Sequence, residues 1–544
     1  MPVLELRITD VVAYSLGIWL VSKLLGYYLS KWRGGVQTTS LRGPPSQSAL
    51  FGLARVIRES EDSSILTEQW VQEYGLAFRV PGVLGSTRVV LVDPKAVTHF
   101  YSRETFGYVK TSLSKSFIER LFGRGLLWAE GESHRRQRRA LSPAFSNAAI
   151  RKLTSVFYDS SYKLKDNWDA MLDSSSGDGA IIDIQKWMNH VSLDSIGIAG
   201  FGHDFGSLDG KVPSVVRVFE LMNTGSSTLS LFVFLLSSVL PFIFNFPTND
   251  NRQWSELHIA MKSIADDLLE RTRRESEGLL REKIEEKSII GLLIKAESTD
   301  TDTQLQMSQE EILAQMNTLL LAGYETTSTH PEYLVSLTWA LIELARKPEK
   351  QQKLREELSR FSTADPTWDQ LVSELPYLDS VVHEVLRLHP PVTDTNAVAA
   401  EDDIIPLSNP IVTATGESVS SIVVRRGTTV TAPIRTINRS TAFWGPNAKE
   451  FEPERWLEES GIPAKQFQGH RHILTFSDGP RICLGRSFAL AEFKAALSVL
   501  IRNYIFELID GPETKIEKHR SILPRPKVAG QTGAKVPMKV KRVA

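Results

Sequence analysis

Cys483 is the single cysteine among 544 residues, and its neighbours are those of a reactive thiolate. It lies in the segment FSDGPRICLG (residues 476–485), and a strong helix pattern begins directly after it. A helix N-terminus and the backbone N–H groups of a glycine-containing loop both stabilise a negatively charged sulfur. A lone cysteine also excludes an internal disulfide framework and every multi-cysteine zinc or iron–sulfur site. Any sulfur chemistry therefore depends on Cys483, with Arg481 as a cation for a nearby anionic group.

Three further groups of residues have spacings that suit a function. Glu384 and Arg387 are three residues apart, so on a helix they share one face and can form an ion pair. Upstream, AGYETT (322–327) lies in a long predicted helix, where Gly323 costs about 1 kcal/mol relative to alanine and so needs a specific reason. The basic run HRRQRR (134–139) is either a solvated helix face or a clamp for an anion.

Together these segments resemble the cytochrome P450 family. The family's cysteine signature FxxGxRxCxG is matched at Phe476, Gly479, Arg481, Cys483 and Gly485. Other landmarks follow the family's order across nearly the whole chain: AGxxT at 322–326, ExxR at 384–387 and a PERF-like segment at 451–456. Five residues at fixed spacing make the cysteine signature specific, whereas ExxR by itself would usually be an ordinary surface pair.

The resemblance implies a haem b cofactor, with Cys483 as the axial ligand of the iron and the rest of the signature as the cofactor-binding loop. His134 and Arg138 occupy the place of the family's WxxxR, with histidine in place of tryptophan, and by resemblance both bind haem propionates. Another propionate-binding arginine often follows ExxR in this family. This chain has Asn396-Ala397-Val398-Ala399 there, so the sequence provides no arginine for that contact.

The family's oxygen-binding segment corresponds to residues 322–327. By resemblance, Ala322 and Gly323 lie beside the cofactor, and the missing side chain of Gly323 leaves room for dioxygen above the iron. Thr326 would hydrogen-bond the distal oxygen, and Glu325 would relay protons to it. The family's buried ionic triad would consist of Glu384, Arg387 and Arg455.

The reaction that the resemblance implies is insertion of one dioxygen atom into a lipophilic small molecule, while the other atom leaves as water. No fused flavin domain is visible, so the expected electron donor is an NADPH–cytochrome P450 reductase that docks near the cysteine side, helped by Arg471 and Arg481. Mostly apolar candidate walls favour a terpenoid-like substrate of fungal secondary metabolism.

Other activities stay open at this point. The alternative substrates are fatty acyl chains, polyketides and xenobiotics. A haem-thiolate isomerase or dehydratase is a second class, although such relatives commonly lose the acid and alcohol pair that Glu325 and Thr326 retain. A non-catalytic haem sensor or carrier is a third class, and it would not need an oxygen-activation helix.

The elements that must position these residues are expected to form a mainly α fold with small β-sheets, the cytochrome P450 fold. The composition, 42% hydrophobic and 23% charged, is that of a globular protein, and the net charge of −1 gives no nucleic-acid signature. Apolar periodicity predicts helices around 309–329, 337–360 and 484–501, a strand at 88–92 and short β-segments over 400–435. The expected organisation is an anchor (1–33), a proline-containing hinge (34–45) and one catalytic domain (46–544).

Two apolar runs raise the question of a membrane. Residues 11–29 approach the roughly 20 apolar residues of a membrane span, interrupted by Lys23 and followed by the cationic flank Lys31-Trp32-Arg33. The positive-inside rule then predicts a retained anchor in the endoplasmic reticulum membrane with the catalytic domain facing the cytosol, the alternative being a helix in the interface. The second run, 229–246, contains Pro241 and fits soluble core, a substrate-access lid or a membrane-dipping loop better than a span.

The chain departs from its relatives just after the oxygen-binding segment. Trp339 lies thirteen residues after Thr326, where a typical member has about seven. Six extra residues in a continuous helix would advance the phase by about 600° and turn the apolar face away from its packing. Pro331 also disfavours an unbroken helix. We predict a broken or bulged helix over 328–335 that resumes its usual register by Leu337; a misassigned coding boundary is the alternative.

Overall fold

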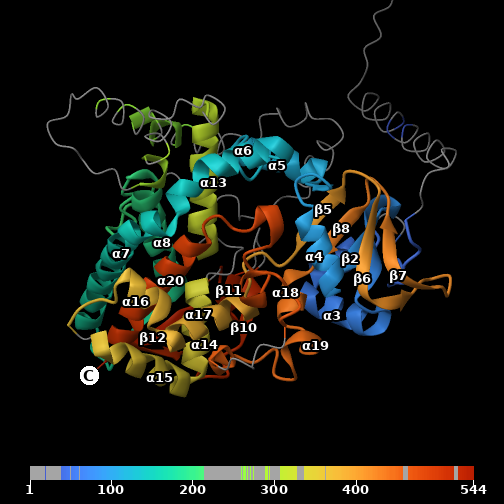
Figure 1. Cartoon of the computed structure of the whole chain (residues 1–544). Helices are drawn as coiled ribbons and strands as arrows, with labels where there is room; N and C mark the ends of the chain where they lie inside the picture. Colours follow the sequence, from blue (N-terminus) through green and yellow to red (C-terminus); the bar gives the residue numbers. More distant parts are fainter. Residues whose placement is uncertain are drawn as a thin grey trace, which may run out of the picture.

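The computed structural model describes residues 38–48, 51–60, 62–213, 307–327, 336–361, 363–457, 464–519, 525–533 and 535–543, with isolated residues in 17–22 and 259–293. Helices gather on one side of the molecule and most strands on the other (Figure 1). The helices that frame the molecule are α2 (Ala54–Glu59), α3 (Ser63–Tyr74), α4 (Pro94–Ser102), α5 (Ser112–Phe122), α6 (Gly131–Leu141), α7 (Asn147–Asp173), α8 (Ile184–Phe201), α13 (Gln309–Thr327), α14 (Ser336–Arg346), α15 (Pro348–Leu358), α16 (Trp368–Ser373), α17 (Pro376–Leu388), α18 (Ile434–Asn438), α19 (Thr441–Trp444) and α20 (Arg486–Asn503). The mainly α prediction with small sheets is confirmed.

The strands form four small sheets within the described residues. The largest has the order β1-β2-β8-β5-β3, in which only β2 and β8 run parallel. A three-stranded antiparallel sheet has the order β4-β12-β9, and β6 with β7 and β10 with β11 form antiparallel pairs. The strands are β1 (Ala77–Pro81), β2 (Thr87–Leu91), β3 (Tyr108–Val109), β4 (Ala180–Asp183), β5 (Thr395–Ala399), β6 (Asp403–Val412), β7 (Ser418–Val424), β8 (Thr429–Ala432), β9 (Tyr504–Leu508), β10 (Ile516–His519), β11 (Arg525–Val528) and β12 (Pro537–Arg542).

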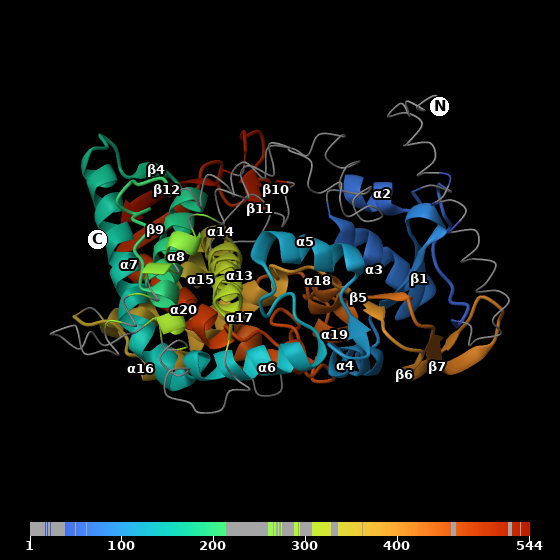
Figure 2. The same ribbon diagram turned by 90° about the horizontal axis from the view of Figure 1, so that it is seen from above.

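Helix α13 runs through the middle of the molecule, between α8 and α5 (Figure 2). Helix α20, which follows the cysteine loop, packs against α7, α15 and α17 and also contacts α13. Its segment from Ala491 to Ile501 is buried throughout, which explains the near-continuous apolar pattern of that stretch. The two helices that carry the sequence motifs are therefore central elements of the core.

Local sequence explains where several of these helices begin and end. Asp93 caps α4 by accepting from the N–H of Ala96, and Pro94 occupies the first turn, where no N–H donor is needed. The single helix predicted over 337–360 is wrong: α14 ends at Arg346 and α15 begins at Pro348. Proline disfavours helical backbone in the preceding residue, so Lys347 separates the two helices.

Of the predicted hinge over 34–45, residues 38–45 are described, and they contact the body of the molecule. The N–H of Thr39 donates to the carbonyl of Val423 at 2.9 Å, and Leu41 is buried in the core. A Cβ on Gly43 would lie 2.0 Å from the carbonyl oxygen of Arg79, so this segment packs tightly against β1. Residues 38–45 therefore pack against the rest of the described chain, while the domain boundary at residue 46 stays a prediction.

No helix within the described residues is long and apolar enough to span a membrane. Of the predicted anchor, only Gly17, Trp19 and Ser22 are described, and all three are helical. The second apolar run, 229–246, lies outside the described residues, as do the predicted helix break at 328–335 and residues 214–258. Leu337 lies in α14 and is fully buried, together with Leu341 and Ile342, while the break and the register between α13 and α14 stay a prediction.

Candidate active site

Cys483 lies in a short loop between the 3-10 turn η7 (Gly479–Arg481) and α20. The loop is closed by the N–H of Cys483, which donates to the carbonyl oxygen of Phe476 at 2.8 Å. Gly479 has φ +62°, and a Cβ there would lie 2.2 Å from the carbonyl oxygen of Tyr101 in α4. The glycine at this signature position is therefore required both by its left-handed backbone and by close contact with α4.

The sulfur of Cys483 is in a mixed electrostatic environment. Burial raises the pKa of the thiol, whereas the backbone N–H of Gly485 and the cations Arg138 and Arg486 lower it. The side chain nevertheless has exposed surface, although it lies at the start of a buried helix. A cation that coordinates sulfur deprotonates it, so these groups suit a metal-bound thiolate.

Helix α6 presents His134 and Arg138 one turn apart on one face. Burial, followed by the charges of Arg481, Arg138 and Lys110, lowers the pKa of His134 to about 3, so its imidazole is neutral and retains one N–H donor. The Arg138 guanidinium has no hydrogen-bond or ion-pair partner among the described residues. Its positive charge interacts electrostatically with the Cys483 sulfur. Both side chains are thus available to an anionic group near the cysteine.

Arg481 is turned inward. Its guanidinium donates to the carbonyl of Ala129 at 2.7 Å and to the carboxylate of Glu130, and its side chain is 16% exposed. The prediction that Arg481 helps to dock a reductase is therefore wrong for this residue. Arg471 is 41% exposed and pairs with Asp379 at 2.6 Å, so it does lie at the surface.

Two residues of the oxygen-binding motif in α13, Ala322 and Gly323, have described surroundings. Ala322 is exposed, although α13 runs through the middle of the molecule (Figure 2). A Cβ on Gly323, by contrast, would lie 2.4 Å from Cγ1 of Ile196 in α8. The explanation that the missing side chain of Gly323 leaves room for dioxygen is therefore wrong, because Ile196 fills that space. The backbone of Glu325 and Thr326 belongs to α13, but their side chains lie outside the described residues.

A polar contact between α13, α6 and the loop before α6 was not predicted from the sequence. The side chain of Gln315 accepts from the N–H of Leu126 at 3.0 Å and donates to Gln137 at 2.8 Å. A Cβ on Gly125 would lie 2.8 Å from the carbonyl oxygen of Ala314, so the loop touches α13 directly. The only signal in the sequence was a glutamine within each segment, Gln315 and Gln137. That the two side chains pair depends on the tertiary structure and could not be predicted.

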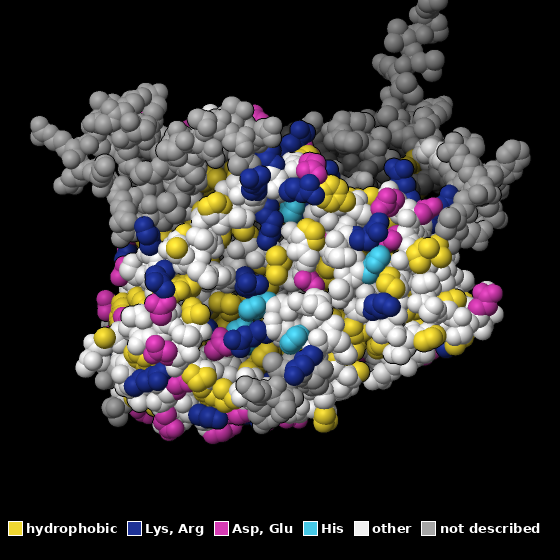
Figure 3. All heavy atoms as spheres, in the orientation of Figure 1, with side chains coloured by type: hydrophobic (Ala, Val, Ile, Leu, Met, Phe, Trp, Pro, Cys, Tyr) yellow, Lys and Arg dark blue, Asp and Glu magenta, His cyan; other side chains and the backbone are white. Residues whose placement is uncertain are grey.

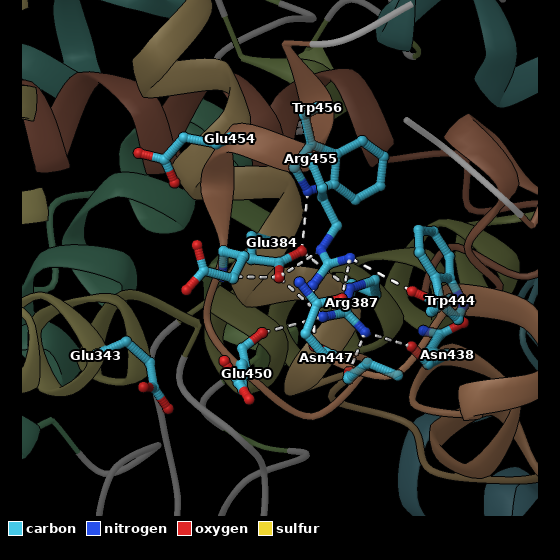
Figure 4. Close-up of polar contacts among 12 residues, drawn as sticks. Glu343, Glu384, Arg387, Asn438, Trp444, Asn447, Glu450, Glu454, Arg455 and Trp456 are labelled. Atoms are coloured by element: carbon cyan, nitrogen blue, oxygen red, sulfur yellow. Dashed lines mark hydrogen bonds and ion pairs between the residues drawn. The ribbon is translucent and has the colours of Figure 1, made fainter. Parts of the chain in front are cut away.

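The structure brings Glu384, Arg387 and Arg455 together in one buried cluster (Figure 4). One carboxylate oxygen of Glu384 accepts from Arg387 at 2.8 Å and from Arg455 at 2.9 Å, and Trp456 donates to the other at 3.0 Å. Burial alone would raise the pKa of Glu384, but the two guanidinium groups hold it below its ordinary value. Arg387 also donates to the carbonyl oxygens of Asn438 at 2.8 Å and Ala448 at 2.6 Å.

The stretch that replaces the second propionate-binding arginine forms β5. Asn396 is exposed, and its side-chain oxygen accepts from Thr431 at 2.7 Å, while Ala397 is buried. No cation lies at residues 396–399, so any charge that balances a second propionate must come from another segment.

A thiol before a central helix, the donors of His134 and Arg138 on α6, and a buried Glu-Arg-Arg cluster define the class of protein. The family model for cytochrome P450 matches residues 42–531, and the chain belongs to this family.

The chain is 61% identical over 546 residues to cytochrome P450 monooxygenase claP of Ampulloclitocybe clavipes, covering all of this chain and 99% of that protein. It is 60% identical over 547 residues to claO of the same fungus, covering all of this chain and 99% of that protein. Cytochrome P450 monooxygenase 205 of Postia placenta is 37% identical over 528 residues, covering 93% of this chain and 94% of that protein. The chain is an enzyme of the cytochrome P450 monooxygenase class.

Proposed function

We propose that this enzyme uses a thiolate-ligated haem b to insert one atom of dioxygen into a lipophilic, terpenoid-like substrate of fungal secondary metabolism. The observation that carries the proposal is the loop around Cys483, whose N–H and glycine contacts hold the chain's single cysteine at the start of the central helix α20. A haem held by a cysteine thiolate supplies the oxygen-activating chemistry, because the thiolate favours cleavage of the O–O bond.

The side chains around the cysteine fit a haem with two propionates. Cys483 would ligate the iron, and Arg138, whose guanidinium has no partner among the described residues, would bind a propionate. Neutral His134 would add one N–H donor, and the remaining N–H groups of Arg481 would add further donors. Phe476, Gly479 and Gly485 would shape the loop beneath the ring.

Helix α13 would then provide the opposite wall. Ala322, which is exposed, would lie beside the bound group. On the family pattern AGxxT that the chain retains, Glu325 would deliver protons and the hydroxyl of Thr326 would hold a proton ready for the dioxygen substrate. By resemblance to the family, Val392, which is 41% exposed, would belong to the apolar walls of the substrate chamber.

The relatives support a role in fungal secondary metabolism, and their names specify no substrate. Five cytochrome P450 monooxygenases of Ampulloclitocybe clavipes that share the name cla are 55% to 61% identical to this chain. Several such enzymes in one fungus fit a set that diversified around related substrates. This pattern is typical of secondary metabolism, where one carbon skeleton is oxidised at several positions.

We further propose that the electrons come from an NADPH–cytochrome P450 reductase at the endoplasmic reticulum membrane, on its cytosolic side. The apolar run 11–29 and its cationic flank support the location. The face in Figure 3 carries several histidine, lysine and arginine side chains near its centre, which suits a partner with acidic groups. Arg471 would contribute to docking through its exposed guanidinium.

The central experiment compares the wild-type enzyme with Cys483→Ala. The reduced wild-type protein under carbon monoxide should show the red-shifted band near 450 nm that thiolate ligation produces in this family, and Cys483→Ala should lose both the band and turnover. Product mass spectrometry with a matched reductase and a panel of terpenoid, fatty acyl and polyketide substrates then tests the substrate class. Turnover that needs neither dioxygen nor NADPH would instead identify an isomerase or dehydratase.

A further inference from the structure

Glu130 has an acidic side chain in an unexpected place. It is the N-cap residue of α6, where an acidic side chain would ordinarily accept from the first backbone N–H groups of the helix. Its side chain makes no such cap. One carboxylate oxygen accepts instead from the backbone N–H of Lys110 at 2.9 Å and lies 3.3 Å from the Lys110 ammonium. The other oxygen accepts from the Arg481 guanidinium.

This group is largely covered by protein. The side chains of Lys110, Glu130 and Arg481 are 15%, 13% and 16% exposed. Each comes from a different element: Lys110 follows β3, Glu130 precedes α6, and Arg481 ends η7. Solvent screens such a pair far less than a surface pair, so the carboxylate has a strong influence on where both cations lie.

The two cations would otherwise repel each other. Burial and then the charge of Arg481 lower the pKa of Lys110 to about 8, whereas Glu130 acts in the opposite sense. Lys110 and Arg481 also both depress the pKa of His134, so they lie close to the side chain that faces the cofactor site. Glu130 is thus the carboxylate that holds two like charges together next to the proposed propionate donors.

We propose that Glu130 is a positioning residue for the cofactor: it fixes Arg481 and Lys110 so that their remaining N–H donors meet the haem propionates. The inference rests on the proposed haem site. The proposal also provides a cation for the second haem propionate, for which residues 396–399 offer no arginine. Lys110 would be this cation, the third beside Arg138 and Arg481. Lys110 is well placed for this, since β3 pairs with β5, the strand that contains Asn396.

The test measures how fast the ferric holoenzyme loses haem to an excess of apomyoglobin. Partners that orient a cofactor ligand typically contribute about 10- to 100-fold to its retention, so Glu130→Ala should release haem about tenfold faster. Glu130→Gln keeps an oxygen acceptor for the Lys110 N–H and should show a smaller increase. Glu132→Ala is the matched control: it lies in the same helical turn, pairs with Arg135 and is 72% exposed, and it should leave the rate unchanged.

A double-mutant cycle separates positioning from a purely structural role. If Glu130 acts partly through Arg481, Glu130→Ala should accelerate haem loss less in the Arg481→Gln background than in the wild type, because only Lys110 is then left to position; Arg481→Lys replaces Arg481→Gln if that variant retains no haem. Fully additive effects, or an unchanged rate in Glu130→Ala, would overturn the inference even if the melting temperature falls. A wild-type protein that binds no haem would instead contradict the proposed function itself.

Discussion

Glu104 is a second acidic side chain near these cations, and it has an unusual protonation state. It is 5% exposed, and its Oε2 has no hydrogen-bond partner among the described residues. Burial raises its pKa to about 7, with Arg481 and Lys110 opposing that shift and Glu130 and Asp478 adding to it. A carboxyl group with this pKa is partly protonated at neutral pH, so its charge depends on small changes in pH.

The raised pKa makes stability depend on pH in a definite direction. The folded state binds the Glu104 proton more tightly than the unfolded state, whose pKa is near the ordinary value of 4.5. The stabilising contribution is therefore complete below about pH 4.5 and is lost as the pH rises through about 7. Relative to Glu104→Gln, the wild-type holoenzyme should lose up to about 3 kcal/mol between pH 5 and pH 8.

Thermal unfolding of both proteins across this pH range checks the prediction. The two melting temperatures should be similar near pH 5 and should diverge as the pH rises, with the glutamine variant the more stable. Curves that stay parallel from pH 5 to pH 8 would show that Glu104 does not titrate in this range.

Some residues of the candidate site could be predicted from the sequence, and others could not. Cys483 and its glycines could be predicted, because their chemistry depends on a loop that is contiguous in the sequence. Glu130 could not, because an acidic residue before a helix indicates an N-cap, and its actual partners are 20 and 351 residues away. Charges that meet only in the folded protein leave no local pattern.

At the scale of elements, the close contact between α8 and α13 explains why residue 323 is a glycine, whereas the sequence had suggested space for dioxygen. Interior glycine in a helix is compatible with an open space and with close packing, and the sequence alone does not separate the two. Ile196 decides between them, because its side chain lies where a Cβ would stand. The prediction of α13 itself was nearly correct in its bounds, since apolar periodicity over a long segment is the strongest signal.

Gly323→Ala should therefore destabilise the enzyme in spite of the better helix propensity of alanine. Overpacking a core contact costs about 1–3 kcal/mol, against a gain of about 1 kcal/mol from propensity. Ile196→Ala should abolish the clash, so Gly323→Ala should become neutral or stabilising in that background. Melting temperatures of the four proteins measure this, and an equal loss in both backgrounds would contradict the packing explanation.

The segment between α13 and α14 gives a second prediction about elements. Helix α14 is buried from Ser336 to Ala345 and packs against α17 and β9, so its position depends on contacts that do not involve residues 328–335. We expect deletion of residues 330–335 to leave haem incorporation unchanged or improved. Collapse of folding in the deletion variant would mean that the extra residues are integral to the core.

At the scale of the whole molecule, the Glu384 cluster joins segments that are far apart in the sequence. Glu384 and Arg387 lie on α17, and Arg387 donates to carbonyl groups at Asn438 and Ala448 in the long segment that leads to Arg455. This segment continues to the cysteine loop, since the side chain of Asn438 accepts from the N–H of Leu474 at 3.1 Å. The ion cluster thus connects α17 to the loop that holds the sulfur.

Glu384→Ala should consequently affect the whole fold and not only α17. It would leave two buried guanidinium groups without their carboxylate, a change that costs about 3–5 kcal/mol, which is a large part of the 5–15 kcal/mol that stabilises a typical domain. Lys353→Ala is the matched control, because it breaks an ion pair to Glu454 in the same region at a site that is 48% exposed. Such surface pairs contribute about 0–1 kcal/mol.

We expect little soluble haem-loaded protein from Glu384→Ala, a partial yield from Glu384→Gln and a normal yield from Lys353→Ala. The haem-to-protein ratio and the urea midpoint of unfolding measure this. A loss in Glu384→Ala no larger than in the surface control would show that the loop around Cys483 holds its shape without the cluster.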